Sequence, residues 1–411
     1  MEKLNIVSNR SKDDSLTEEL KQSGLPVVLY GIGLIADTAR IYLQKRGIPV
    51  SCRVIDDKYL DPLWHHTGSD RILSISGLQN EYSAYNLLLC FFGGYKNDLQ
   101  PYRQLFPGAR TVAYLSSIYE QGAVQAMESS YVLTHKPEFD RVYDLLEDSL
   151  SRDSMQAYIN AKINKDASYL FPYVRRPQYF SETNQVPALR LHQYEIMVNC
   201  GAFTGDTIKD FLEVTSRRFD KIYACEPDSA NLQKLARFVQ SAGIADRTEI
   251  VSKCISDKAG TVYFLNQGTM LSRKSETPGP GVVTLQSDTI DNILDSRPVS
   301  LIVMDVEGNE LKALEGARKT IQSHQPLLAL AAYHKKDDLP VLTTFLKKLV
   351  PAYRFYFRVH KPMAIDAVLY ASTRNEQVSA TARYTYHPPP TLPRIISGAA
   401  KNRWNLSAPK L

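Results

Sequence analysis

The sequence predicts an α/β protein with two mostly parallel β-sheets, a smaller one in the N-terminal part and a larger one in the C-terminal part. Residues 27–56 and 195–228 both read as strand, glycine-containing turn, helix and second strand, and each second strand is followed by an acid, Asp56 or Glu226. Such βαβ units pair their strands in parallel. A chain of 411 residues is also long enough for two or three domains.

The N-terminal domain is predicted at residues 26–120, after a helical leader at residues 1–25. Ser15-Leu-Thr-Glu18 matches a capping box and predicts a short helix that ends at Gly24. The apolar runs predict strands at 27–30, 50–55, 86–92 and 111–114 and a helix at 35–46. This alternation is typical of a small Rossmann-like domain.

The first turn of this domain carries a candidate nucleotide site. Gly31 and Gly33 follow the first strand, and Asp56 stands about where a ribose-binding acid belongs. The third glycine of the usual motif is replaced by Ala36. Two interpretations remain open: a second nucleotide site at Gly31, Gly33 and Asp56, or a tight turn in an α/β domain that binds no ligand.

Residues 121–185 predict a helical connector. Helical spacing occurs at 139–150 and 155–163, and the aromatic, proline-containing segment 171–180 follows. Tyr179 and its aromatic and basic neighbours in that segment either face a substrate or pack between the domains, and we expect packing.

The larger domain is predicted at residues 186–373. Strands are expected at 196–198, 221–225, 249–254, 261–265, 299–304, 327–332, 353–359 and 367–370. The last two have no helix between them, so we expect an antiparallel pair and hence one antiparallel strand near the edge of the sheet. Residues 266–281, rich in proline and glycine, are expected to be flexible, and residues 374–411 to be a basic, proline-containing, disordered tail.

Composition and charge narrow the function. The chain is 44% hydrophobic and 23% charged, and no apolar run approaches the roughly 20 residues that span a bilayer. The first ten residues lack the apolar segment of a signal peptide, so we expect a cytoplasmic protein. The net charge of +5 resides in residues 374–411, which argues against nucleic-acid binding by the body. The five scattered cysteines are predicted to be buried free thiols. The sequence is also compatible with a homo-oligomer.

Polar residues follow each predicted strand of the larger sheet. In open α/β sheets, ligands bind outside the carboxyl ends of the strands. The residues at these ends are Asn199, Glu226, Ser256, Asp257, Asp305, Glu307 and His334. Their regular placement predicts a binding site along that edge.

Several motifs in this domain resemble those of one known family. In chain order they are VNCGAFTGDTIKDF, ACEPDSANLQKL, VMDVEGNELKALEGA, AAYHKKDDL and the pair YRFYFRVH and AIDAVLYA. They resemble the successive motifs of FkbM-family methyltransferases, including the small Rossmann-like domain and helical linker that often precede them. The resemblance implies a Rossmann-like methyltransferase sheet, S-adenosylmethionine as the cofactor, and methyl transfer to a hydroxyl of a saccharide or nucleotide-linked sugar. The expected partner is a small-molecule or glycan acceptor.

The resemblance also implies roles for individual residues. Gly201, Ala202, Phe203, Gly205 and Asp206 would line the methionine and ribose of the cofactor. The ribose hydroxyls would be held by Glu226, and the adenine would be contacted by Pro227, Asp228, Ser256 and Asp257. The family usually has an acid where this chain has Asn199, which puts full affinity for the cationic cofactor in doubt.

The acceptor is expected at the ends of the later strands. His334 is the candidate base because an imidazole of ordinary pKa, about 6.5, accepts a proton at neutral pH. Asp305 would orient it or the hydroxyl, and Glu307 would hold neighbouring hydroxyls. Alternatively, His334 simply begins a helix. Glu310 reads as a solvated first-turn acid outside the site, and the Asp305-x-Glu307 spacing alone is too little to predict a metal.

Two other functions remain open. A nicotinamide-dependent oxidoreductase would use Gly31, Gly33 and Asp56, although no partner domain for hydride chemistry is evident. A non-catalytic protein that binds a cofactor or sugar nucleotide would explain Asn199 and the basic tail.

Overall fold

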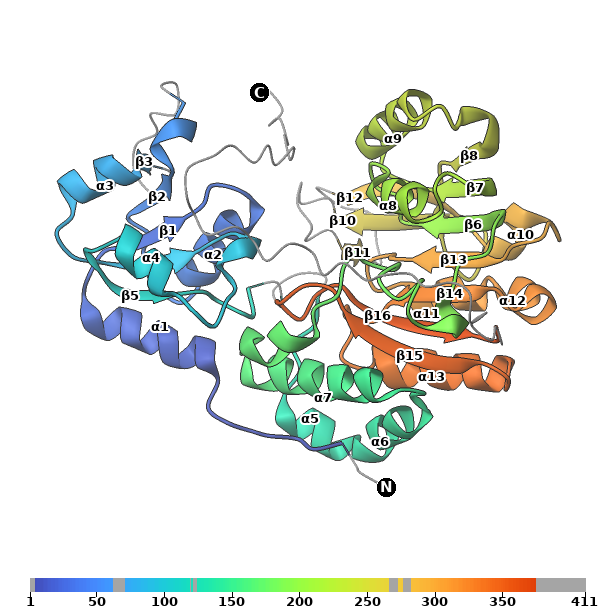
Figure 1. Cartoon of the computed structure of the whole chain (residues 1–411), viewed down its shortest axis with the longest axis horizontal. Helices are drawn as coiled ribbons and strands as arrows, with labels where there is room; N and C mark the ends of the chain where they lie inside the picture. The colour runs from blue at the N-terminus through green and yellow to red at the C-terminus, as the bar shows by residue number, and fades with distance from the viewer. Residues whose placement is uncertain are drawn as a thin grey trace. The chain divides into compact units, whose positions relative to one another are not determined.

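The N-terminal domain is a five-stranded parallel sheet with strand order β3-β2-β1-β4-β5 (Figure 1). The computed structural model describes residues 4–61, 71–118, 120, 124–265, 273–275 and 282–374. The strands are β1 Val27–Tyr30, β2 Cys52–Ile55, β3 Ile72–Ser74, β4 Tyr85–Leu89 and β5 Ala109–Ala113. The helices are α1 Lys12–Ser23, α2 Leu34–Gln44, α3 Ile75–Glu81 and α4 Gln100–Leu105. The strand positions deduced from the apolar runs are confirmed, and the short β3 was not predicted.

Helix α1 begins earlier than its capping box predicted. The N-cap is Ser11, whose hydroxyl accepts a hydrogen bond from the N–H of Asp14 at 3.2 Å. Ser15 therefore lies inside the helix, where its hydroxyl donates to the carbonyl of Ser11. The predicted end is right, because Gly24 adopts a left-handed conformation with φ +62°.

The connector contains three helices, α5 Ser129–Thr134, α6 Lys136–Leu145 and α7 Ser149–Asn164. The helix expected at 139–150 is divided because Asp148 caps α7, accepting from the N–H of Ser151. Helix α7 packs on strand β15 (Arg354–Val359): the rings of Tyr158 and Phe357 lie 5.5 Å apart, and the N–H of Phe357 donates to the Ser151 hydroxyl.

The larger sheet has seven strands in the order β15-β16-β14-β13-β6-β7-β8. Its other strands are β6 Glu195–Cys200, β7 Phe219–Cys225, β8 Thr248–Val251, β13 Leu301–Met304, β14 Leu327–Ala331 and β16 Ala367–Ser372. Strand β16 runs antiparallel to both of its neighbours, β14 and β15, which confirms the predicted antiparallel strand near the edge. The remaining neighbours pair in parallel.

Helices cover both faces of this sheet, so that its strands are buried on both sides (Figure 1). Helices α8 Asp206–Val214 and α9 Ser229–Ser241 lie on one face, together with Tyr179 and Phe180 of the connector. The opposite face is covered by α10 Ile290–Leu294, α11 Glu310–Glu315, α12 Arg318–His324 and α13 Asp338–Leu349. Burial on two faces explains why β13 reads as a continuous apolar run.

The C-terminal domain also contains a four-stranded sheet, the third sheet of the chain. Its order is β11-β10-β12-β9, with β9 Cys254–Ile255, β10 Gly260–Leu265, β11 Arg273–Ser275 and β12 Val282–Asp288. This sheet was not predicted. Within the stretch expected to be flexible, residues 273–275 form β11, and the rest lies outside the described residues.

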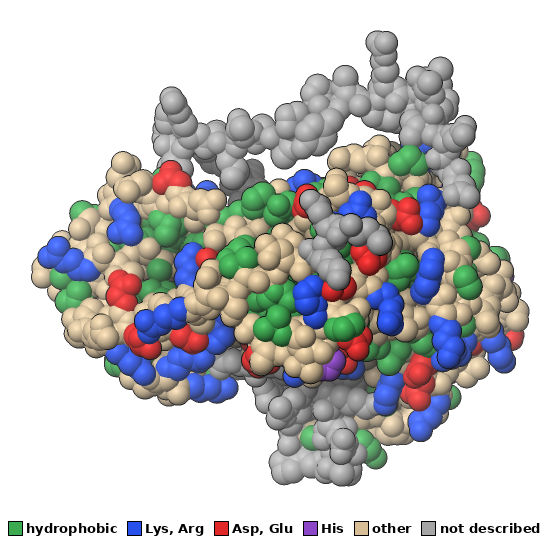
Figure 2. All heavy atoms as spheres, turned by 90° about the horizontal axis from the view of Figure 1, so that it is seen from below, with side chains coloured by type: hydrophobic (Ala, Val, Ile, Leu, Met, Phe, Trp, Pro, Cys, Tyr) green, Lys and Arg blue, Asp and Glu red, His purple; other side chains and the backbone are tan. Residues whose placement is uncertain are grey.

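The expected disordered tail also lies outside the described residues, apart from Arg374. Its guanidinium forms a 2.9 Å ion pair with the fully buried Glu195 of β6, so Arg374 belongs to the folded body. All five cysteines are buried and form no disulfide bond, as expected. Among the described residues, no helix is long and apolar enough to cross a membrane. On the face shown in Figure 2, basic and acidic side chains are interspersed.

Candidate active site

The four central strands of the main sheet end at one level. Cys200 at the end of β6 is in register with Cys225 of β7 and Met304 of β13, and Met304 is in register with Leu330 of β14. The polar residues that follow these strands therefore share one edge. Of the residues predicted for the site, Asn199 and Glu226 mark its β6–β7 half, and Asp305, Glu307 and His334 mark its β13–β14 half.

Two glycines shape the loop between β6 and α8. Gly201 has φ +83°, and a Cβ there would lie 1.9 Å from the carbonyl oxygen of Asp305. Gly205 has φ +95°, and a Cβ there would lie 2.4 Å from the ring of Phe238 on α9. Close packing against the protein itself thus requires both glycines. The contact at Gly201 brings the two halves of the site together.

Glu226 holds this loop in place from the end of β7. Its Oε2 accepts a hydrogen bond from the N–H of Phe203, and its Oε1 accepts one from the N–H of Asp228, both at 2.9 Å. Burial raises the pKa of Glu226 above its ordinary value. Asp228 caps α9 by accepting from the N–H of Asn231, which gives this predicted adenine-side residue a structural task.

Asn199 is almost fully buried, with 1% of its surface exposed, and its Nδ2 has no hydrogen-bond partner among the described residues. A buried donor without a partner is costly unless a ligand or water satisfies it. Nearby, Ala202 is buried and Phe203 is exposed. Asp206 begins α8, and burial raises its pKa.

Ser256 and Asp257 follow β9 of the small sheet rather than a strand of the main one. The Ser256 hydroxyl donates to Asp257 at 3.0 Å. Asn309, which was not predicted, links them to the loop after β13: its amide donates to the carbonyl of Ile255 at 2.8 Å and to the Ser256 hydroxyl at 3.4 Å.

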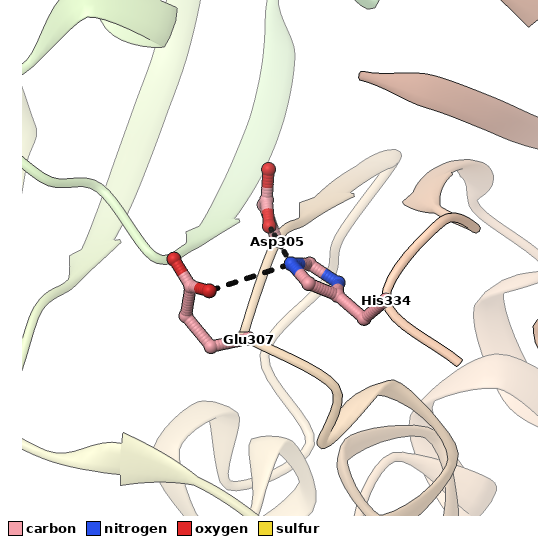
Figure 3. Close-up of side chains that lie close together, drawn as sticks. All are labelled: Asp305, Glu307 and His334. Atoms are coloured by element: carbon pink, nitrogen blue, oxygen red, sulfur yellow. Dashed lines mark ion pairs between the residues drawn. The ribbon is translucent and has the colours of Figure 1, made fainter. Parts of the chain in front are cut away.

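The structure brings Asp305, Glu307 and His334 together, and we call these three residues the carboxylate–histidine cluster (Figure 3). Nε2 of His334 lies 3.6 Å from Oδ1 of Asp305 and 3.4 Å from Oε2 of Glu307. The histidine side chain is 1% exposed, whereas those of Asp305 and Glu307 are 25% and 44% exposed. The two carboxylates therefore cover the imidazole on its accessible side.

Partners outside the cluster fix the other oxygen of Asp305. The hydroxyls of Tyr179 and Tyr333 both donate to its Oδ2, at 3.0 and 3.1 Å. Its Oδ1 is buried and has no hydrogen-bond partner among the described residues. Tyr179 comes from the segment expected to pack between domains, so sequence reasoning missed its contact with the site.

The structure corrects the expectation that Glu310 lies outside the site. It was predicted to be a solvated first-turn acid, yet it is 1% exposed and its Oε1 lies 3.1 Å from Nδ1 of His334. The same oxygen accepts from the N–H groups of Val306 and Gly308. Helix α11 is oriented so that its first turn faces the sheet edge, which the acid's position in the sequence does not reveal.

These charges change the chemistry expected of His334. Burial opposes the cationic form, but the carboxylates of Glu310, Glu307 and Asp305 raise the pKa of His334 well above its ordinary value. Burial also raises the pKa of Asp305 to about 7, against the opposing charge of His334. Without a ligand, His334 therefore holds its proton at neutral pH and is a poor base, and the carboxylates are the proton acceptors that remain.

The N-terminal candidates have structural partners of their own. A Cβ at Gly31 would lie 2.7 Å from the carbonyl oxygen of Cys90 on the neighbouring segment. Asp56 accepts a hydrogen bond from the Tyr30 hydroxyl at 3.0 Å. Gly33 precedes α2 and has open space around it. A nucleotide site at these residues stays a prediction.

Comparison with known proteins agrees with the resemblance seen in the motifs. Residues 199–355 match the family model of the methyltransferase FkbM domain. A crystal structure of methyltransferase FkbM from Methylobacillus flagellatus KT is 23% identical, with a TM-score of 0.63, and the match covers 89% of this chain and 94% of the other. At this identity the likeness concerns the fold.

Two smaller proteins match part of the chain. An rRNA methylase from Streptococcus thermophilus is 14% identical, with a TM-score of 0.32, over 49% of this chain and 98% of its own. A putative methyltransferase, SMU.1697c, from Streptococcus mutans in complex with SAH is 13% identical, with a TM-score of 0.28, over 44% and 90%. No curated protein matches the chain. Residues 199–355 are thus similar to the methyltransferase FkbM domain, and the chain shares the fold of the methyltransferase FkbM from Methylobacillus flagellatus KT.

Proposed function

We propose that the protein transfers a methyl group from S-adenosylmethionine to a hydroxyl of a saccharide or a nucleotide-linked sugar. The observation that carries the proposal is the shared edge of β6, β7, β13 and β14, where unsatisfied polar atoms of Asn199 and Asp305 lie on either side of the Gly201 contact. The family match supports methyl transfer, and the hydroxyl acceptor is what the resemblance of the motifs implies.

The cofactor would occupy the β6–β7 half. Oε2 of Glu226 accepts one hydrogen bond, from the N–H of Phe203, and keeps a lone pair free for a ribose hydroxyl. Oε1 accepts from the N–H of Asp228 and, at 3.5 Å, from the amide of Asn231. Asn199 would donate its free amide hydrogens to the carboxylate of the methionine moiety. The nearby N-terminus of α8 adds a favourable dipole for that carboxylate.

The acceptor would lie against Asp305 and Glu307. In the reaction its oxygen attacks the methyl carbon, the new O–C bond forms as the C–S bond breaks, and S-adenosylhomocysteine leaves. The hydroxyl proton passes to a carboxylate of the cluster, since the imidazole of His334 lies behind both of them. Holding the two reactants in line supplies much of the acceleration. Several carboxylates at one edge suit neighbouring sugar hydroxyls, each of which donates a hydrogen bond.

Calorimetric titration with S-adenosylhomocysteine tests the cofactor site. Glu226→Gln removes the charge but keeps the shape, and losing charge-assisted hydrogen bonds worth about 1.5–3 kcal/mol weakens binding roughly 10- to 100-fold. Glu213→Gln is the matched control, because that side chain is 68% exposed on the outside of α8. Absent binding by the native protein, or equal affinity of the Glu226 variant and the native protein, would refute the assignment.

The acceptor class is tested by transfer of a labelled methyl group to fractionated glycans and sugar nucleotides. A labelled product whose methyl group withstands alkaline hydrolysis, and is released as methyl iodide by hydriodic acid, supports an O-methyl ether on a sugar. Cofactor binding with no labelled glycan or sugar nucleotide in any fraction would instead favour a binding protein. Enhanced NADH fluorescence on mixing with the protein would favour the oxidoreductase.

A further inference from the structure

The atoms of the carboxylate–histidine cluster are spaced for an ion between them. Nε2 of His334 lies 3.4 Å from Glu307 Oε2 and 3.6 Å from Asp305 Oδ1, and the three ligand atoms lie within 4.8 Å of one another. Direct N–H···O hydrogen bonds are shorter, about 2.9 Å. Four ligands placed tetrahedrally about 2.1 Å from a metal ion are separated by roughly 3.4 Å. The two distances from Nε2 agree with the second arrangement.

The residues around the cluster hold its ligands as residues behind metal ligands usually do. A histidine that binds a metal through one nitrogen commonly presents the other to a carboxylate. Here Nδ1 of His334 forms a 3.1 Å ion-pair contact with the buried Glu310, without the alignment of a hydrogen bond, and Glu310 is itself fixed by two backbone N–H groups. Asp305 shows the same pattern, because Tyr179 and Tyr333 bind its Oδ2. Its buried Oδ1, which faces Nε2 of His334, is left without a hydrogen-bond partner.

Charge and backbone conformation give further support. Three carboxylates surround one imidazole within a largely buried region, so a cation would relieve their mutual repulsion. Glu307 has a left-handed backbone, with φ +55°, although it carries a side chain. Such a conformation is strained for a residue with a side chain and is typical of functional sites. In this protein it accompanies a Glu307 side chain directed at the imidazole (Figure 3).

We propose that Asp305, Glu307 and His334 bind one divalent transition-metal ion of the Zn²⁺ or Mn²⁺ class. The imidazole nitrogen favours such ions over Mg²⁺ and Ca²⁺, which prefer oxygen ligands alone. Three protein ligands leave a coordination position open, as in catalytic rather than structural sites.

The role of the ion rests on the function proposed above. The open position would receive the acceptor hydroxyl, and coordination to a divalent ion lowers the pKa of a bound hydroxyl. An adjacent sugar hydroxyl on the same ion would fix the ring, so that one position of the sugar is methylated. The ion would also take the place of the proton on Nε2 of His334, and the oxygen of Glu307 that does not bind the ion would receive the hydroxyl proton, since Tyr179 and Tyr333 occupy Oδ2 of Asp305.

A second group of potential ligands shares the same histidine. Glu310, His334 and Asp338 also lie within ligand distance, and all three are buried. An ion there would use Nδ1 and would need Oε1 of Glu310, which already accepts two backbone hydrogen bonds, and it would have no access to a substrate. We therefore assign the ion to the carboxylate–histidine cluster. The variants described below distinguish this site from the site formed by Glu310, His334 and Asp338.

The test is metal binding by the full chain without a histidine tag, after dialysis against EDTA. Calorimetry with ZnCl₂ and with MnCl₂, and metal analysis after gel filtration, should show one ion per chain. Asp305→Asn and Glu307→Gln should each weaken binding at least 30-fold, and Glu310→Gln about 10- to 100-fold through His334. Asp338→Asn and the surface variant Glu213→Gln should bind like the native protein. Circular dichroism and the unfolding midpoint verify that each variant is folded.

Three results would overturn the proposal. The first is that the native chain binds neither Zn²⁺ nor Mn²⁺, and the second is that the Asp305 and Glu307 variants both bind with native affinity. The third is that Asp338→Asn loses metal binding while Glu307→Gln retains it. The titration with S-adenosylhomocysteine is done on the same EDTA-treated protein. Cofactor binding without metal binding would refute the metal site alone. Metal binding without cofactor binding would refute the proposed function alone.

Discussion

Replacing Gly201 by alanine should destabilise the protein more than a left-handed glycine normally costs. A Cβ at this position would lie 1.9 Å from the carbonyl oxygen of Asp305, where φ is +83°. The left-handed backbone costs a residue with a side chain about 1–2 kcal/mol, and displacing the packed backbone costs about 1–3 kcal/mol more. We expect a total loss of roughly 2–5 kcal/mol in the free energy of unfolding.

Gly243→Ala is the matched control for this experiment. Gly243 has φ +63°, and a Cβ there would meet nothing within 4 Å, so only the backbone cost of about 1–2 kcal/mol applies. Urea unfolding of both variants, followed by circular dichroism, gives the two losses, and their difference isolates the collision with Asp305. Equal losses in the two variants would show that the loop and Asp305 do not meet as described.

Two further predictions concern buried charges. Arg358→Met should lower the free energy of unfolding by about 3–5 kcal/mol. The buried Arg358 forms ion pairs with Asp148 and with Glu182, which is also buried, and the variant leaves both acids without their partner. A loss below about 1 kcal/mol on urea unfolding would contradict this prediction. Burial raises the pKa of Asp13 from 3.8 to about 6, so the folded state favours the neutral form of this carboxyl group. The native protein should therefore lose about 3 kcal/mol of stability through Asp13 as the pH rises from below 4 to above 6. Asp13→Asn removes that loss, so the difference in unfolding free energy between variant and native protein should shift in the variant's favour between pH 4 and pH 7, and a pH-independent difference would rule the effect out.

The sequence predicted the elements that depend on periodic burial. Strand β1 was expected at its observed residues, and the β15–β16 pair was expected to be antiparallel because no helix separates the two strands. Of the sheet formed by β9 to β12, only β10 was expected, at 261–265. The other strands were missed because they are short or partly exposed and carry no regular apolar pattern. Runs of this kind take their structure from pairing with one another, which local sequence does not encode.

The candidate site was predictable at the level of which strand ends bear polar side chains. The grouping of Asp305, Glu307 and His334 followed from that rule. Which way a helix turns its first acid does not follow from it, and so Glu310 was taken for a solvated residue. The proton on His334 depends on Glu310, because the ordinary pKa of histidine describes an imidazole in water and not one among three carboxylates.

The outermost strand of the main sheet, β15, has consequences for how the chain can be divided. Its free side is met by connector residues: the N–H of Glu147 donates to the carbonyl of Phe355, and the N–H of Arg175 to the carbonyl of Val359. A fragment cut at residue 186 would bare those carbonyls and offer a template for strand addition by another copy. Such a fragment should aggregate, so the C-terminal domain is expected to be soluble only when it is expressed together with its preceding helices.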